Sequence, residues 1–131
     1  MSWKKGLWLG LISSILASIA CYIYSYLYTI AFYVDFSKVI NLTSIISSCI
    51  IACLLMAVGY VVLIKWNGQR LIGWVNTVYS ILSFASIVGV LSFNLPLDIE
   101  SPEMFPGLAI PMHCFPVLSF LTIYPFFINR K

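Results

Sequence analysis

The sequence predicts an all-α fold: an integral membrane four-helix bundle whose two termini both lie on the cytoplasmic side. Hydrophobic residues make up 62% of the 131 residues and charged residues 8%, whereas a soluble domain carries about 25% charged residues. Four apolar runs are each long enough to cross a bilayer, and the basic pairs fall at one side of these runs. The seven Lys and Arg and four Asp and Glu are too few to cover a soluble domain, so lipid is expected to cover most of the surface.

The predicted spans form a single transmembrane domain and cover residues 7–33, 43–64, 71–93 and 108–128. An α-helix rises 1.5 Å per residue, so about 20 apolar residues cross the hydrocarbon core of a bilayer. The first run is interrupted only by Ser, Thr, Cys and Tyr, and it is long enough to tilt or to project outward. A short polar segment separates the second run from the third, and an acidic, proline-rich outer loop at residues 94–107 precedes the fourth.

The positions of Lys and Arg orient the bundle, because short loops rich in these residues are retained in the cytoplasm. The basic residues near the chain ends and in the second loop are Lys4, Lys5, Lys65, Arg70, Arg130 and Lys131. The first loop carries only Asp35 and Lys38 as charged residues, and the third loop carries acids alone. We therefore predict a multi-pass protein of the cytoplasmic (inner) membrane with its N and C termini inside.

Aromatic residues gather near both predicted interfaces. The four tryptophans, Trp3, Trp8, Trp66 and Trp74, all lie at the inner interface. The outer part of the first span contains several tyrosines, among them Tyr24 and Tyr28. Trp and Tyr rings commonly sit at the headgroup level. We interpret these tyrosines as interfacial anchors, and the alternative is an aromatic wall of a ligand site.

Charge and cysteine content argue against two other classes of protein. The net charge is +3, but the basic residues sit at helix ends and form no stripe, so no nucleic-acid partner is expected. The cysteines are Cys21, Cys49, Cys53 and Cys114, and all of them lie within apolar runs. A free Cys in such a place behaves as a small hydrophobe, and no disulfide framework is predicted.

Small residues repeating every four positions predict where helices approach closely in lipid. The first span carries Gly6, Gly10 and Ser14 at this spacing, and the second span has a similar face. We expect the two faces to meet inside one bundle, and the alternative is that one of them is a homodimer surface. Asn76 lies near the inner end of the third span, where we expect an interhelical hydrogen bond; a polar cavity is the alternative.

The start of the fourth span contains the strongest candidate for a polar site. Pro116 removes the hydrogen bond to the carbonyl of Met112, so a kink is expected near His113. Pro111 is well tolerated if the helix begins there, because a first-turn proline loses no hydrogen bond. A freed carbonyl beside the only histidine of the chain would form a polar spot in the outer half of the bundle.

His113 supports two interpretations. In the first interpretation, His113 is a metal or haem ligand or a proton-handling group. Cys114 would assist it, or Cys49 and Cys53, which share one helix face. Alternatively, it lies near the headgroups and bonds Glu103 or a backbone carbonyl. We favour the second interpretation, because zinc sites usually show short, dedicated Cys and His spacings that this sequence lacks.

The acids of the third loop are the remaining candidates for a ligand site. Asp98, Glu100 and Glu103 could bind a cation or act as an acid and base pair. An acidic outer loop is more often solvated, and this one agrees with the predicted orientation of the bundle. We therefore favour the solvated loop.

The last third of the chain resembles a known family. The stretch PLDIESPEMFPG at residues 96–107, with IPMHCFP at 110–116, is similar to small bacterial four-helix membrane proteins of unknown function. These proteins carry a Pro-Met-His motif at the start of the last helix. The resemblance implies four spans, assigns no activity, and makes His113 and Glu103 motif positions.

The sequence contains no Gly-rich phosphate loop, nucleophile elbow or HExxH pattern, so neither enzyme activity nor a cofactor is predicted. The favoured hypothesis is a non-enzymatic accessory or interaction subunit of a membrane complex. Its partners would be the lipid bilayer and other membrane subunits or further copies of the chain. The alternative hypothesis is a small-molecule, metal or haem binding site around His113.

Overall fold

The computed structural model describes residues 2–96 and 98–127. For residues 67–69 it describes the backbone only. The described residues form four α-helices: α1 (Trp3–Phe32), α2 (Leu42–Asn67), α3 (Ile72–Leu91) and α4 (Phe105–Ile123). Three short 3-10 helices adjoin them: η1 (Gly68–Leu71), η2 (Pro102–Met104) and η3 (Tyr124–Phe127). No strand occurs within this part of the chain, so the all-α prediction is confirmed. Each of the four segments is long and apolar enough to cross a membrane.

Polar side chains mark where the first two helices begin. The Ser2 hydroxyl accepts a hydrogen bond from the backbone N–H of Lys5 at 3.3 Å, and the Asn41 side-chain oxygen accepts one from the N–H of Ser44 at 2.8 Å. These bonds satisfy amide groups that lack a partner within the first turn of a helix. Tyr33 ends α1 with a φ of 55°, the left-handed conformation common after the last residue of a helix.

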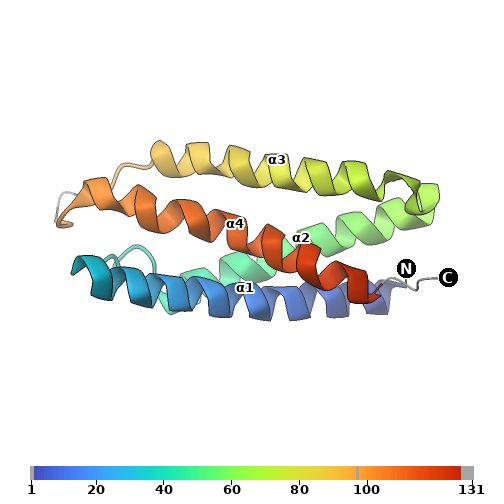
Figure 1. The fold of residues 1–131 in the computed structure, drawn as a ribbon, viewed down its shortest axis with the longest axis horizontal. Coiled ribbons are helices and arrows are strands. Elements are labelled where there is room, and N and C mark those ends of the chain that lie inside the picture. The colour runs from blue at the N-terminus through green and yellow to red at the C-terminus, as the bar shows by residue number, and fades with distance from the viewer. Residues whose placement is uncertain (1, 97, 128–131) are drawn as a thin grey trace.

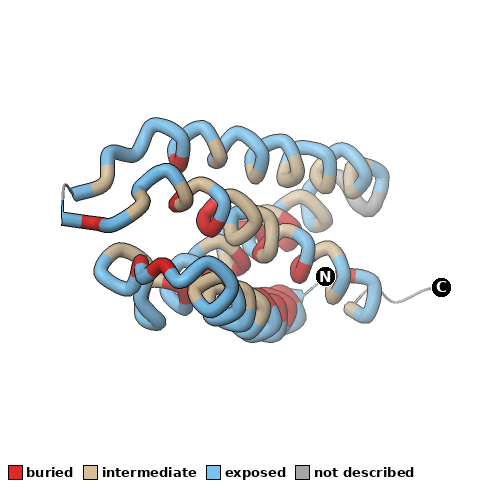
Figure 2. Tube along the Cα trace, turned by 60° about the vertical axis from the view of Figure 1, so that its left-hand side comes forward, coloured by how far each residue is buried: buried red, intermediate tan, exposed pale blue. Residues whose placement is uncertain are grey.

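Helix α1 packs along both α2 and α4, whereas α3 packs mainly along α4 and makes few contacts with α2. Figure 1 shows α2 and α3 joined through η1 and separating away from it, with α4 between them in that view. Within α3 only Val90 is buried, and Figure 2 shows this helix as an exposed edge of the molecule. Helix α1 therefore packs closely against α2 and α4, and α3 lies at the edge of the bundle, attached mainly through α4.

The seam between α1 and α2 is built from very small side chains. Gly6, Gly10 and Ser14 are buried on α1. A Cβ atom at Gly6 would overlap the side chain of Val61, and one at Gly10 would lie 3.1 Å from the Cβ of Ala57. Helices in lipid associate closely through such small residues. The small-residue face predicted on the first span therefore lies against α2, at Ala57. The row predicted on the second span, Ser44, Ser48 and Ala52, instead lines a cavity between α2, α3 and α4.

The bundle has a basic end, formed by residues 2–5 and 65–71, and an acidic end, formed by residues 33–41, 92–96 and 98–101. At the basic end the Lys65 amine lies 5.1 Å from the centre of the Trp3 ring. At the acidic end the Lys38 amine lies 2.6 Å from a carboxylate oxygen of Asp98. The predicted basic residues Arg130 and Lys131 lie outside the described residues.

The acidic outer loop is shorter than predicted. We expected the loop to cover residues 94–107 and the fourth helix to begin near residue 108, but η2 begins at Pro102 and α4 at Phe105. The proline in the first turn of α4 is Pro106, and both Pro111 and Pro116 lie inside the helix. Proline fits the first turn because its ring matches helical φ and no hydrogen bond is lost there. Pro106, rather than Pro111, therefore takes the first-turn position.

Candidate functional site

Helix α4 continues through two internal prolines because side chains of α1 bond its freed carbonyls. Pro111 cannot donate to the carbonyl of Gly107, and the Tyr24 hydroxyl donates to that oxygen at 2.8 Å. Pro116 cannot donate to the carbonyl of Met112, and the Cys21 thiol donates to it at 3.7 Å. A proline inside a membrane helix is tolerated when a neighbouring helix supplies the missing donors.

A third donor extends this row toward the acidic end. The Tyr28 hydroxyl donates to the carbonyl of Met104 at 2.8 Å. Residues 21, 24 and 28 are spaced by three and four positions, so they share one face of α1. From the sequence we predicted that the Met112 carbonyl is freed, but we did not predict its partner. We interpreted Tyr24 and Tyr28 as anchors at the membrane interface. The spacing of tyrosines on α1 against prolines on α4 was the signal that could have revealed this row.

A cavity of about 500 Å³ lies between α2, α3 and α4 in the half of the bundle nearer the acidic end; we call it the groove. Cys21 of α1 also lines it. The groove opens to the outside of the bundle, because its lining residues Leu55 on α2 and Leu82 on α3 are 67% and 58% exposed. If the helices span a bilayer, the mouth between α2 and α3 faces the lipid.

The lining of the groove is mainly apolar and carries no acidic or basic side chain apart from His113. Its hydroxyl groups come from α2 and α3: Ser44, Ser48, Tyr79, Ser83 and Ser86. The Ser83 hydroxyl donates to the carbonyl of His113 at 2.9 Å. Within the described residues the hydroxyls of Ser44 and Ser48 donate no hydrogen bond, so both are available to a bound molecule.

His113 lines the groove and is oriented by its own helix. Its Nδ1 atom lies 2.8 Å from the carbonyl oxygen of Ala109. A carbonyl oxygen can only accept, so Nδ1 carries the proton and Nε2 of the neutral ring is left as an acceptor. The partner is therefore a backbone carbonyl rather than Glu103, which belongs to the exposed η2 segment.

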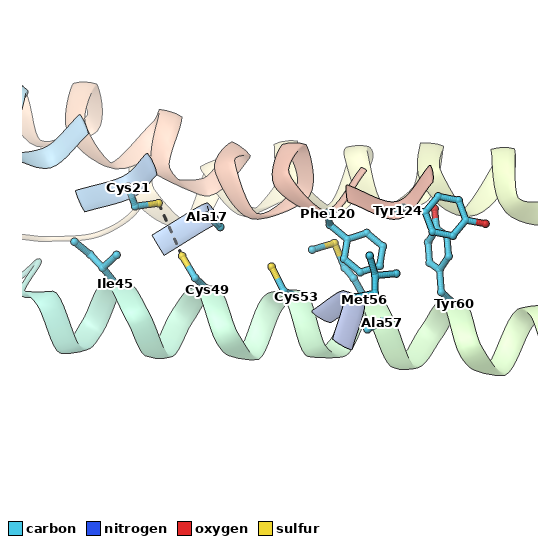
Figure 3. Close-up of a cluster of buried hydrophobic side chains, with 11 residues drawn as sticks. Ala17, Cys21, Ile45, Cys49, Cys53, Met56, Ala57, Tyr60, Phe120 and Tyr124 are labelled. Atoms are coloured by element: carbon cyan, nitrogen blue, oxygen red, sulfur yellow. Dashed lines mark hydrogen bonds between the residues drawn. The ribbon is translucent and has the colours of Figure 1, made fainter. Parts of the chain in front are cut away.

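The four cysteines do not form one cluster: two face each other, and the other two lie apart from them. Figure 3 shows the Cys21 and Cys49 side chains directed toward each other, and their sulfur atoms are 3.9 Å apart. The Cys53 thiol donates to the carbonyl of Pro116 at 3.8 Å, and Cys114 is half-buried away from the groove lining. Among the residues that the structure describes, no three His, Cys, Asp or Glu side chains lie close enough to hold a metal ion.

Large aromatic rings close the space between α2, α3 and α4 on the side of the groove nearer the basic end. The aromatic cluster consists of Tyr60, Tyr79, Phe120 and Tyr124, with ring centres of Tyr60 and Tyr124 4.4 Å apart. Asn76 lies on α3 in this half of the bundle. Its buried side-chain oxygen has no hydrogen-bond partner among the described residues, so the interhelical bond predicted for Asn76 is not formed through this oxygen.

At the acidic end, Asp98 forms an ion pair with Lys38 of the first loop. Their hydrogen bond and opposite charges lower the pKa of Asp98 and raise the pKa of Lys38. The backbone N–H of Ser37 donates to Asp35 at 2.8 Å and lowers the pKa of that carboxyl. Glu100 and Glu103 are exposed. The structure therefore uses Asp98 to join two loops and does not gather the three loop acids into one site.

Comparison of the chain with models of known protein families, with curated proteins and with solved structures gives no match. The resemblance of residues 96–116 to a family with a Pro-Met-His motif therefore stays a prediction.

Proposed function

We propose that this chain is a membrane protein that binds a neutral, lipid-soluble amphipathic molecule in the groove. The groove itself is the observation that carries the proposal. It combines an apolar volume of about 500 Å³ with a few hydrogen-bonding groups, which is the usual composition of a small-molecule site. Its exposed mouth between α2 and α3 allows a molecule to enter from the acyl-chain region without passing through water.

The chemistry of the lining favours an uncharged polar group on the occupant. Ser44 and Ser48 supply hydroxyl donors, and Nε2 of His113 supplies an acceptor. A phosphate or a carboxylate would find no Lys or Arg in the groove, and burying an unpaired charge is costly. An ammonium group would likewise find no carboxylate. A neutral head group with both carbonyl and hydroxyl functions matches these partners.

We propose that the four helices cross a cytoplasmic membrane with both termini inside. Lys4, Lys5, Lys65 and Arg70 lie at the basic end, which supports placing that end in the cytoplasm. The exception, Lys38, lies at the acidic end and is paired with Asp98. In this orientation the groove lies in the outer leaflet half of the bundle, and its occupant would be drawn from that leaflet.

The proposal is tested with the full chain in vesicles that contain a diazirine-labelled diacylglycerol, a neutral amphipathic probe. Irradiation followed by peptide mapping is expected to give adducts concentrated on the groove walls near Leu55 and Leu82. Ser48→Leu places a larger side chain in the groove and should reduce these adducts. Ser47→Leu makes the same change at a neighbouring exposed position outside the groove and should leave them unchanged.

A diazirine-labelled phosphatidylglycerol serves as the charged comparison and should label the exposed faces of the helices diffusely. The proposal fails if the neutral probe gives the same diffuse pattern. It also fails if Ser48→Leu and Ser47→Leu reduce labelling of the groove walls to the same extent. Native mass determination of the gently extracted chain provides a second readout, because bound neutral lipid adds a defined mass.

A second candidate function, an accessory or interaction subunit, is favoured by the edge position of α3. Only Val90 of this helix is buried, and a Cβ atom built at Gly73, which lies on the same face of α3 as Phe84, meets nothing within 4 Å. Glycines on an exposed membrane helix allow the backbone of another helix to approach closely. We propose a transmembrane helix of another membrane protein as the occupant of this face.

The second candidate is tested with a photo-cross-linking amino acid placed at Phe84 of α3 or at Ile15 of α1. The two positions are similarly exposed, at 65% and 60%. A partner on α3 predicts a discrete protein adduct from position 84 and none from position 15. Lipid adducts alone from both positions, with a native mass of one chain, would contradict this function.

A further inference from the structure

Two of the groove-lining residues are cysteines whose thiols are already in contact. Cys21 and Cys49 belong to α1 and α2, are each 2% exposed, and both line the groove. Their sulfurs are 3.9 Å apart, with the Cys49 thiol donating to the Cys21 sulfur. The Cys21 thiol in turn donates to the carbonyl of Met112. The hydrogen-bond chain therefore runs from α2 through α1 to the freed carbonyl of α4.

We infer that Cys21 and Cys49 form a redox-active dithiol, and that its oxidant is a lipid-soluble quinone bound in the groove. This inference rests on the function proposed above and names the class of occupant. A quinone is neutral, has an apolar ring and tail, and carries two carbonyl acceptors. The free hydroxyls of Ser44 and Ser48 are donors for those carbonyls, and they lie on the same helix as Cys49.

The step balances as a two-electron transfer. The two S–H bonds break, one S–S bond forms between Cys21 and Cys49, and the two electrons and two protons pass to the quinone, which leaves as a quinol. The sulfur of one cysteine adds to a ring carbon of the quinone, and its proton passes to one ring oxygen. The second sulfur then attacks the first, which breaks the C–S bond and returns the electron pair to the ring, and its proton passes to the other ring oxygen. Closure brings the sulfurs from 3.9 Å to about 2.05 Å.

Oxidation also changes the hydrogen bonding of the groove wall. In the disulfide, Cys21 has no proton to donate, so the Met112 carbonyl loses the partner that replaced the missing N–H of Pro116. An unpartnered carbonyl away from water is unfavourable. A quinol carries hydroxyl donors that a quinone lacks, and one of them can bond this carbonyl. With the dithiol reduced, the groove should therefore bind the quinone more tightly than the quinol. With the disulfide formed, it should bind the quinol more tightly.

The experiment uses the full chain, reduced and reconstituted in lipid nanodiscs, and a short-chain ubiquinone as the probe. Of the four free cysteines, two should become resistant to alkylation, with one quinone reduced per chain. Peptide mapping should find Cys21 joined to Cys49. Cys49→Ser and Cys21→Ser should each abolish the reaction, whereas Cys53→Ser, a matched change one turn away on α2, should leave it intact.

Two further arms separate failure of this inference from failure of the proposed groove function. Ser48→Leu should slow oxidation by the quinone by about 100-fold, a loss that displacement of a reactant by ~1 Å can cause. It should not slow oxidation by diamide, a small oxidant that needs no groove. Labelling by the diacylglycerol probe independently reports whether the groove binds lipid.

The redox inference is overturned if diamide joins Cys21 to Cys49 but the quinone does not. It is also overturned if neither reagent joins them, or if Ser48→Leu leaves the quinone reaction unchanged. In each case groove labelling by the neutral lipid probe would still support the proposed function. Quinone-dependent loss of the two thiols that Ser48→Leu suppresses selectively would support both.

Discussion

The two halves of the bundle close the same interface in different ways. Toward the basic end, the rings of Tyr60, Phe120 and Tyr124 fill the space between α2, α3 and α4, and Phe120 is completely buried. Toward the acidic end, the same three helices present Ser48, Ser83 and other small side chains, and the groove remains. The clustered rings of Tyr60 and Tyr124 lie nearer η1, where α2 and α3 are joined, and the serines of the groove lie where the two helices have separated. The groove is therefore specified by side-chain volume as well as by helix direction.

The two halves also differ in how their helices are held together. In the half nearer the basic end the helices are held mainly by packing. Of the cluster's hydroxyls, only that of Tyr79 is bonded within the part of the chain that the structure describes, to the Met56 carbonyl at 3.0 Å, whereas the buried hydroxyls of Tyr60 and Tyr124 have no partner there. In the other half, Tyr24 and Cys21 donate to the backbone of α4, and Tyr28 donates to the carbonyl of Met104, immediately before it. We therefore expect mutations to act through lost volume in one half and through lost hydrogen bonds in the other.

The largest effect is expected when the aromatic cluster is opened. Phe120→Ala should lower the free energy of unfolding by about 3–5 kcal/mol, because it leaves a cavity in a fully buried position. Unfolding by SDS in mixed micelles measures this change. Phe126→Ala, at a position 82% exposed, is the control and should change stability by less than about 0.5 kcal/mol. Equal losses in the two variants would show that the cluster is not closely packed.

A smaller effect is expected from adding volume at the tightly packed contact between α1 and α2. Gly10→Ala places a Cβ atom 3.0 Å from the Leu54 side chain and 3.3 Å from the backbone oxygen of Cys53. The resulting strain should cost about 1–3 kcal/mol. In contrast, Ser48→Leu adds more atoms but projects into the groove, and its effect should stay within about 0.5 kcal/mol.

Gly73→Ala is the matched control for Gly10→Ala, because a Cβ atom at Gly73 meets nothing within 4 Å. This change should alter stability by less than about 0.5 kcal/mol, since Gly73 is exposed in the first turn of α3. If Gly10→Ala were as well tolerated as Gly73→Ala, the close approach of α1 to α2 would be refuted.

Removing one hydrogen bond from the other half should have a still smaller effect. Tyr24→Phe deletes the donor to the Gly107 carbonyl and keeps the ring, so the expected loss is about 1 kcal/mol, typical of side-chain hydrogen bonds in membranes. The infrared band of a ¹³C-labelled Gly107 carbonyl should shift as the bond is lost. Tyr26→Phe, at an exposed position, should change neither the stability nor that band.

The smallest effect is expected from the ion pair at the acidic end, because Lys38 and Asp98 are 67% and 63% exposed and solvent screens their attraction. The pKa of Asp98 is lowered, so its contribution is present above the ordinary value of 3.8 and is lost as pH falls through the lowered pKa. The pKa of Lys38 is raised, so the contribution is also lost as pH rises through that raised value. Asp98→Asn should therefore differ slightly from the original chain at neutral pH and not at all in strong acid, by thermal unfolding across pH. A difference that grows on acidification would contradict the pairing.

The four helices could be predicted from sequence because each corresponds to an apolar run, and a run of that length has few alternatives to a helix in lipid. The start of α4 could not be placed as well, because Pro106 and Pro111 both fit a first turn and only the fold chooses between them. Cys49 and His113 were identified as candidates from their chemistry. A small-molecule site around His113 was the alternative hypothesis from sequence, but the outline of the groove could not be predicted, since it depends on the separation of α2 from α3, which no local pattern encodes.

The hydrogen bonds between α1 and α4 have a consequence for biogenesis. A growing chain makes α1 early and α4 only after the other helices, yet the carbonyls of Gly107 and Met112 need donors that only α1 supplies. An isolated α4 in hydrocarbon would leave both oxygens unsatisfied, at a cost of several kcal/mol each. If the four helices cross a bilayer as proposed, stable insertion of α4 is coupled to its docking on α1, and this docking can begin only after the fourth helix has been synthesised.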